Sequence, residues 1–195
     1  MFGTRVTSVG FLITAISWCG SAAVYAGPAP EPLHLAVTVC DFEHVPPTTM
    51  AVAKRIADDA YRTIGVTIDW IEAGCDAGAP GLHVNIVSRE TAGFAVAAWT
   101  LGFAEPGSSA ATVLYDRVLC LGAKFHIRRD VLLGYTMAHE LGHLLLPAHS
   151  HSDSGVMRAS LDLQRAAEKK LCFTSEQAQI ILARLNGASP VTSTN

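Results

Sequence analysis

The sequence predicts one α/β domain of the α+β kind, with a mixed, mostly parallel twisted sheet, a buried central helix and a C-terminal helix. Three observations support this fold class. Short β-branched segments surround an amphipathic helix in the first half, a long segment at 128–146 is apolar on most sides, and a capped helix lies near the C-terminus. The 195 residues, 50% of them hydrophobic, suffice for one full core. We expect this domain to span 27–187.

The first half is predicted to contain a strand–helix–strand unit followed by a third strand. The strand segments are rich in Val, Ile and Thr, which favour extended backbone, and they lie at 33–40, 66–72 and 82–88. The segment 46–65 has helical periodicity, with Thr48 or Thr49 as a plausible N-cap and Gly65 as a stop. A strand, a helix and a second strand in this order predict a parallel pair.

The second half is predicted to hold two more strands and two helices. The strands are placed at 97–106 and 110–120, on either side of the turn-forming "PGSS". The composition of 128–146 suits a helix buried at the centre of the fold. Near the C-terminus, Thr174 and Gln177 have the spacing of a capping box, which predicts a final helix.

The N-terminal segment 1–26 has the pattern of a signal peptide. Arg5 supplies the positive charge, an apolar run follows, and the small-residue sequence "VYA" ends at Ala26. The apolar run is short and interrupted by Ser and Gly, which does not favour a stable membrane anchor. We therefore expect a secreted or periplasmic protein after cleavage, with a flexible polar tail at 188–195.

Export would give the cysteines a structural role. Removal of the signal peptide leaves Cys40, Cys75, Cys120 and Cys172, an even number in an oxidising compartment, and none are spaced as C-x-x-C. Two disulfides are therefore expected. Four cysteines allow three pairings, of which we favour Cys40–Cys75 and Cys120–Cys172, because Cys40 and Cys75 each lie just beyond a predicted strand.

The charge pattern excludes some classes of partner. The formal net charge of −3 and a pI near 6.2 show no basic field of the kind that nucleic acid or anionic lipid requires. Nucleic-acid binding is therefore not expected, and we expect a monomer.

Four of the eight histidines fall within the stretch "HELGHLLLPAHSH" that ends the central helix. On a helix, residues four apart share a face, so His139 and His143 can bind one zinc ion through ring nitrogens. Glu140 points about a quarter-turn away and can reach a water on the metal without ligating it. Zinc lowers the pKa of such a water to about 7 and polarises a carbonyl, while a carboxylate acts as general base. The stretch thus predicts a zinc hydrolase.

The same stretch resembles the metzincin zinc motif H-E-x-x-H-x-x-G-x-x-H, with His149 at the position of the third ligand. Ser150 and the spacing from His149 to Met157 resemble the matrixin branch, in which a Met-turn lies below the metal. The resemblance implies a metzincin-like fold, one catalytic Zn²⁺ held by three histidines, and hydrolysis of peptide or protein substrates with Glu140 as general base.

The sequence departs from this motif at one position. The family glycine is replaced by Leu146, followed by Pro147. Glycine there allows a sharp turn, often with positive φ, whereas a residue before proline favours extended backbone. The turn must then be built differently, for example one residue later. In an extended segment His149 and His151 project to the same side, so His151 is an alternative third ligand.

Other ligand sets are weaker alternatives. Glu168 could act as the downstream glutamate of a gluzincin, and Asp153 could act as a third ligand, although each fits a solvated helical charge or a turn residue better. A second function is also open: with both His149 and His151 bound, the site would be a closed, non-catalytic zinc-binding or peptide-binding module.

The substrate is expected to add as a strand to an exposed sheet edge, as metzincins bind extended peptides. The best candidate edge is "WTLGFAEP" at 99–106, where Gly102 would allow close approach of a peptide backbone and Pro106 would end the strand.

Overall fold

The computed structural model describes residues 32–72, 74–75, 81–92, 97, 100–104 and 108–187. The predicted signal peptide at 1–26 and the polar tail at 188–195 lie outside the described residues. Within the described part of the chain, no helix has both the length and the apolar composition needed to cross a membrane.

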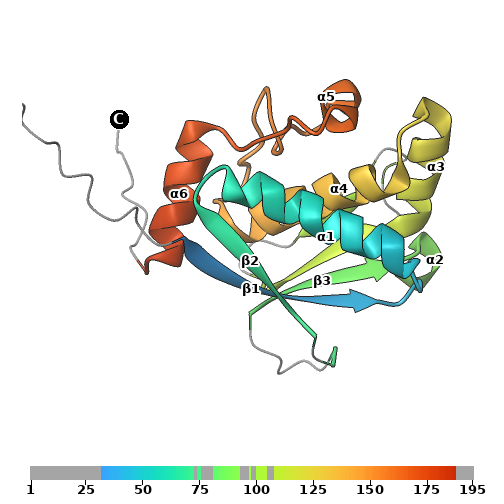
Figure 1. Cartoon of the computed structure of the whole chain (residues 1–195), viewed down its shortest axis with the longest axis horizontal. Coiled ribbons are helices and arrows are strands. Elements are labelled where there is room, and N and C mark those ends of the chain that lie inside the picture. Colours follow the sequence, from blue (N-terminus) through green and yellow to red (C-terminus); the bar gives the residue numbers. More distant parts are fainter. Residues whose placement is uncertain are drawn as a thin grey trace, which may run out of the picture. The chain divides into compact units, whose positions relative to one another are not determined.

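The described residues form five strands and six helices (Figure 1). The strands are β1 (Leu33–Asp41), β2 (Val66–Ile71), β3 (Leu82–Val87), β4 (Gly102–Ala104) and β5 (Ala110–Leu114). The helices are α1 (Pro47–Arg62), α2 (Arg89–Ala92), α3 (Tyr115–Phe125), α4 (Arg129–Leu145), α5 (Leu163–Ala167) and α6 (Ser175–Leu185).

All five strands form one sheet in the order β2-β1-β3-β5-β4. β1 pairs in parallel with both β2 and β3, and β3 pairs in parallel with β5. Only β4, at the edge, is antiparallel, with Phe103 opposite Thr112. The predicted mixed, mostly parallel sheet is therefore confirmed, as are the strands predicted at 33–40, 66–72 and 82–88.

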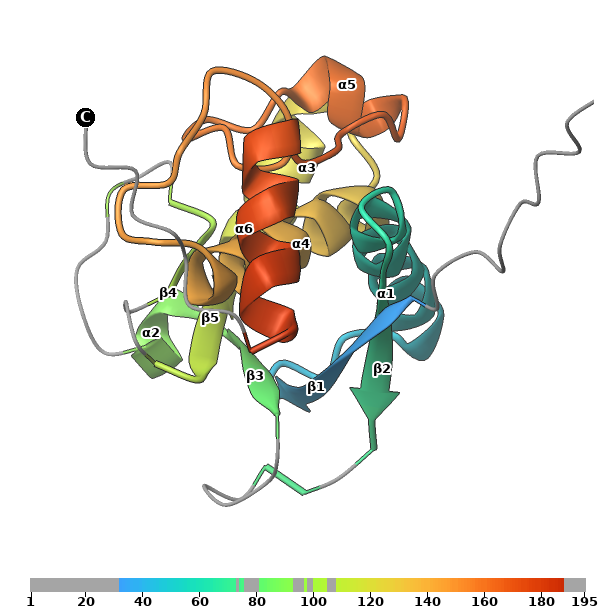
Figure 2. The same cartoon turned by 90° about the vertical axis from the view of Figure 1, so that its left-hand side faces the viewer.

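The main helices lie over one face of this sheet. Figure 1 and Figure 2 show α1 and α4 above the strands, with α6 at one end of α4 and α3 at the other. The sheet contributes alternate β-branched residues to the core, among them Val37, Val84 and Val113, which are fully buried. Tyr61 of α1 lies in the same core and donates a hydrogen bond to the carbonyl of Ala138 at 3.3 Å. The tight packing of α1 on α4 fixes the height of α4 above the sheet.

Helix α4 is the predicted central helix. Of its 17 residues all are buried except Arg129, at the start, and His139 and His143. A helix that is apolar on nearly all sides is stable only inside a core. The two half-buried histidines therefore mark the one strip of α4 that opens towards solvent.

Two sequence predictions about the elements are wrong, and a third is confirmed only in part. The segment predicted as a strand at 110–120 is a strand only to Leu114 and then becomes α3, whose buried residues Tyr115, Val118 and Gly122 have helical spacing. Helix α1 begins at Pro47 with Pro46 as N-cap, not Thr48 or Thr49, because proline already has the φ of a first helical residue and needs no N–H there. The strand predicted at 97–106 is confirmed only at Gly102–Ala104, and parts of it lie outside the described residues.

The final helix follows the prediction. Thr174 is the N-cap of α6, its side chain accepts a hydrogen bond from the backbone of Gln177, and the Gln177 side chain bonds back to the backbone of Thr174. The predicted capping box is confirmed.

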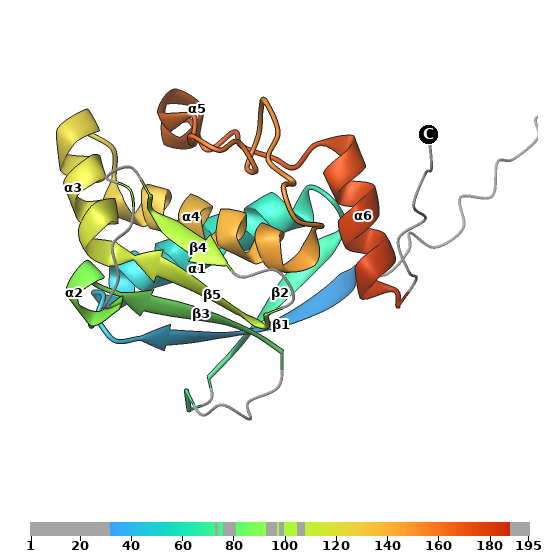
Figure 3. The same cartoon turned by 180° about the vertical axis from the view of Figure 1, so that it is seen from behind.

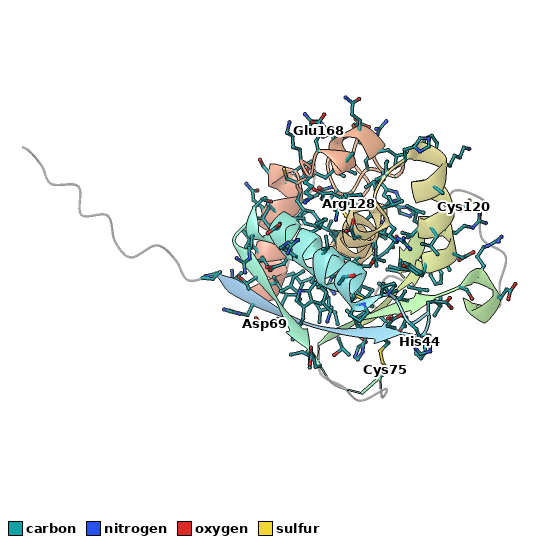
Figure 4. All side chains as sticks on the ribbon, turned by 45° about the vertical axis from the view of Figure 1, so that its right-hand side comes forward. His44, Asp69, Cys75, Cys120, Arg128 and Glu168 are labelled. Carbon is teal, nitrogen blue, oxygen red and sulfur yellow. A yellow bond between two sulfur atoms is a disulfide. The ribbon has the colours of Figure 1, made fainter. Side chains whose placement is uncertain are left out.

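One of the two predicted disulfides is present. Cys40 and Cys75 form a disulfide with a Cα–Cα distance of 5.5 Å, which ties the β2–β3 connection to the end of β1. The predicted pairing of Cys120 with Cys172 is wrong, because both are free and exposed. Figure 4 shows Cys120 on α3, whereas Cys172 lies just before α6, and these two helices stand at opposite ends of α4 (Figure 3). Cys120 and Cys172 had been paired only because they remained after Cys40 was assigned to Cys75.

Candidate metal centre and active-site cleft

Helix α4 brings its two histidines together by its own period. His139 and His143 are one turn apart, and their Nε2 atoms lie 3.0 Å from each other. Their rings meet edge to face, with centroids 4.7 Å apart. Both side chains are half-buried, so the pair faces solvent at the bottom of a depression rather than on an open surface.

The segment after α4, residues 146–157, is named here the histidine loop. Leu146 has φ −101° and ψ 161°, the extended backbone expected before proline. The left-handed turn comes three residues later, at His149, with φ 61°. The chain therefore turns back later than in the family motif, and the residue that meets α4 is His151.

A third ring completes the histidine group. The Nε2 of His151 lies 3.1 Å from the Nε2 of His143, and the ligand atoms of His139, His143 and His151 all lie within 4.8 Å of one another. His149, the first of the two predicted third ligands, is exposed and is not in this group, although it lines the same cleft. Neither Glu168 nor Asp153 belongs to the group.

The histidine loop also sets the tautomer of His139. The Nδ1 of His139 lies 2.7 Å from the carbonyl oxygen of Val156, an acceptor, so Nδ1 carries the proton and Nε2 is left with a lone pair. Burial lowers the pKa of His139, and it lowers the pKa of His143 to about 4, with smaller contributions from His139 and His151. Both rings are therefore neutral near pH 7, which is the form that binds a metal.

Two of the three nitrogen separations match the geometry of a zinc site, and all three nitrogens lie within 4.8 Å of one another. Zn–N bonds of about 2.0–2.1 Å in a tetrahedral site place two ligand nitrogens roughly 3.3 Å apart. The separations of 3.0 Å and 3.1 Å are close to that value. Neutral rings that point lone pairs at one another repel unless a cation or a proton lies between them. Three such ligands leave a fourth position open, as in catalytic zinc sites.

Glu140 lies beside the group without belonging to it. Its side chain is 4% exposed, and its Oε2 has no hydrogen-bond partner among the described residues. Burial raises the pKa of Glu140 to about 8. An unpaired buried carboxyl group is unfavourable unless a charge or a bound molecule compensates it. A cation at the histidine group would do so and would favour the ionised carboxylate.

Met157 lies directly beneath α4. It is fully buried, and a methyl group added at Gly142 would stand 2.4 Å from its Sδ. Because Gly142 lies between Glu140 and His143 in sequence, this contact places the thioether under the turn that carries the ligands. Within the histidine loop, the Ser152 N–H donates a hydrogen bond of 2.9 Å to the Met157 carbonyl. The place of Met157 below the metal, as in a Met-turn, stays a prediction.

The group opens into a cleft of about 940 Å³. Its lining includes the edge strand β4, the histidine loop and residues of the segment that follows Met157. Three residues of α3, namely Leu121, Lys124 and Phe125, also line it, as does Thr136 of α4. The sequence did not predict that α3 lines this cleft, because part of that helix was predicted as a strand.

Gly102 has a role in this cleft that the sequence did not indicate. A Cβ at this position would lie 2.6 Å from the Thr112 carbonyl oxygen and 2.8 Å from Oε1 of Glu140. Glycine is therefore required for β4 to pass over the Glu140 carboxylate. The Val156 carbonyl that orients His139 was also missed, and a backbone acceptor leaves no signal in the sequence.

No protein-family model matches the sequence, and no curated protein matches it significantly. Among solved structures, the chain is similar to a zinc-dependent peptidase from Methanocorpusculum labreanum (strain Z), with a TM-score of 0.50 and 12% identity, over 74% of this chain and 99% of that chain. It also matches myroilysin with a TM-score of 0.39 and 15% identity, over 76% of this chain and 72% of that chain. Only the first likeness is close enough to bear on the fold.

The likeness to the first of these structures extends to the fold alone, and the fold is the mixed α/β one that the sequence predicted. The five-stranded sheet, the buried helix with its two histidines and the third histidine that returns from the following loop agree with the expected class. The resemblance read from the motif is therefore confirmed at the level of the fold.

Proposed function

We propose that this chain is an exported zinc-dependent endopeptidase. The observation that carries the proposal is the convergence of three histidine nitrogens beside a buried, unpaired carboxyl group at the bottom of a cleft. The likeness in fold to a protein described as a zinc-dependent peptidase supports the same reaction class.

His139, His143 and His151 would hold the ion. When bound, zinc supplies a Lewis acid for the scissile carbonyl and lowers the pKa of water at the open position. His151 replaces His149 in this assignment, because the left-handed turn at His149 directs the next-but-one residue towards α4. His139 is oriented by the Val156 carbonyl, and Met157 supports the ligand turn from below.

Glu140 would carry the proton. Its carboxylate accepts a proton from the attacking water and delivers it to the leaving amine nitrogen, which returns Glu140 to its starting state. Burial raises the pKa of Glu140, which makes its carboxylate a stronger base towards the attacking water than an exposed glutamate would be. Gly102 keeps β4 clear of this carboxylate.

A peptide substrate would bind along β4. This strand ends the sheet, so among the described strands it pairs only with β5, and its other edge faces the cleft. An extended peptide adds to such an edge through backbone hydrogen bonds and can place its scissile bond over Glu140. The cleft residues Arg158–Leu161 would then contact substrate side chains.

Export is part of the proposal. The Cys40–Cys75 disulfide is typical of an oxidising compartment, and the signal-peptide pattern at 1–26 supplies a route. We expect the mature protein outside the cytoplasm, secreted or periplasmic.

The test combines metal analysis with peptide cleavage. Purified protein should contain one zinc per chain, cleave members of a mixed peptide library at internal bonds, lose cleavage with a chelator and regain it when zinc is restored. Zinc-loaded protein that cleaves no peptide would contradict the proposal, and cleavage that survives complete removal of metal would contradict the role of zinc.

A further inference from the structure

Gln177 of α6 connects two features that are remote in sequence. Its Oε1 accepts a hydrogen bond of 3.0 Å from the Thr174 N–H, which is the capping-box contact. Its Nε2 donates to the carbonyl oxygen of Ser150 at 3.2 Å and to Oγ of Ser152 at 3.0 Å. Ser150 and Ser152 are the two neighbours of His151.

We propose that Gln177 is the positioning residue for the third metal ligand, so that the first turn of α6 fixes His151 against α4. This inference rests on the proposed zinc site, since it concerns how that site is held. A capping box requires only an acceptor at this position, which glutamate also provides. The cap does not need the two amide protons, and both form hydrogen bonds with the histidine loop.

Because Gln177 is buried, its side-chain amide is held in one orientation. The side chain is 6% exposed, and both ends of its amide are satisfied by protein groups. A buried amide with all its partners present holds one orientation, because any rotation leaves a polar group unpaired. Ser152 can only accept here, because its own hydroxyl donates to the Ser154 carbonyl at 2.8 Å.

His151 needs such support more than the other two ligands do. His139 and His143 are held by a buried helix, and His139 is also bonded to Val156. His151 is exposed and lies outside any helix or strand. Groups that orient a ligand typically change metal affinity about 10–100-fold when they are removed.

The test uses Gln177→Glu, which keeps the capping-box acceptor but replaces the two donors with a carboxylate facing the Ser150 and Ser152 oxygens. Zinc affinity is measured by competition with a chromophoric chelator, and the unfolding free energy of the metal-free protein is measured alongside. We expect zinc affinity to fall about 10–100-fold.

The matched control is Thr174→Ala, which breaks the other half of the capping box and leaves both donors in place. Its zinc affinity should stay within about threefold of the parent.

A double-mutant cycle separates positioning from general stability. In the His151→Ala background, Gln177→Glu should have no further effect on zinc affinity, because the ligand that it positions is gone. If Gln177→Glu does not fold, Ser152→Ala replaces it, since it removes one of the two acceptors and keeps the cap.

Three results would overturn the inference: unchanged zinc affinity in Gln177→Glu, affinity losses in both variants that merely follow their stability, or an undiminished effect in the His151→Ala background. A parent protein that binds no zinc would overturn it as well. A parent that binds zinc but cleaves no peptide would contradict the proposed function and leave these affinity measurements decisive for Gln177.

Discussion

Helix α4 and the histidine loop contribute to the proposed metal centre by different means. In α4, one turn of a regular helix places the Nε2 atoms of His139 and His143 3.0 Å apart, and nearly every other residue of the helix is buried. In the histidine loop, the position of His151 depends on an extended Leu146, a left-handed His149 and hydrogen bonds from α6. Helical geometry is a local property, whereas the loop takes its shape from several distant contacts.

The largest expected effect belongs to the helix. Glu140→Gln keeps the shape of the side chain but removes the proton acceptor, so peptide cleavage should fall about 10²–10⁴-fold. Zinc content should equal that of the parent, because Glu140 is not among the converging ligands. Kinetics and metal analysis on the same sample check this, and a variant that loses zinc together with activity would make Glu140 part of the metal site.

The next largest effect of a substitution is expected where the histidine loop contacts α4. Met157 is fully buried against Gly142, so Met157→Ala leaves a cavity under the ligand turn and should lower the free energy of unfolding by about 2–5 kcal/mol. Met50→Ala, at a half-buried methionine on α1, is the matched control and should cost about 1 kcal/mol. Denaturant unfolding measures both. Equal losses would mean that Met157 has no special packing role beneath α4.

The four cysteines allow a second comparison, between a disulfide and a pair of free thiols. Replacing Cys40 and Cys75 with serine removes a link over a sequence separation of 35 residues and should lower the unfolding free energy by about 2–4 kcal/mol. The same double replacement at Cys120 and Cys172 should change it by less than about 0.5 kcal/mol, because both are free and exposed. Thermal unfolding without reductant tests this pair, and a large loss from the second replacement would show that Cys120 and Cys172 do pair.

The sequence predicted the parts of the fold that depend on local geometry better than the parts that depend on distant contacts. The strands β1 to β3, the helix α4 and the capping box of α6 were predictable because each depends on a periodic pattern or on residues three apart. Helix α3 was missed because it follows β5 without a break, and Tyr115 and Val118 favour a strand locally. Its buried residues Tyr115, Val118 and Gly122 have helical spacing instead.

The details of the site were less accessible. The departure at Leu146 showed that the turn had to change, and it made His151 an alternative to His149, but no local rule chooses between residues two apart in a loop. The features that distinguish them are the hydrogen bonds from Gln177 and the left-handed backbone at His149, which only the folded chain shows.

The central claim is that His151, and not His149, completes the metal centre. The most direct measurement is zinc affinity in His151→Ala and in His149→Gly, where glycine keeps the left-handed turn at φ 61° free of strain. Loss of a ligand should exceed the effect of losing a supporting group, so His151→Ala should weaken zinc binding by more than about 10²-fold. His149→Gly should stay within a few-fold of the parent. The reverse result, with zinc lost in His149→Gly and kept in His151→Ala, would contradict the account.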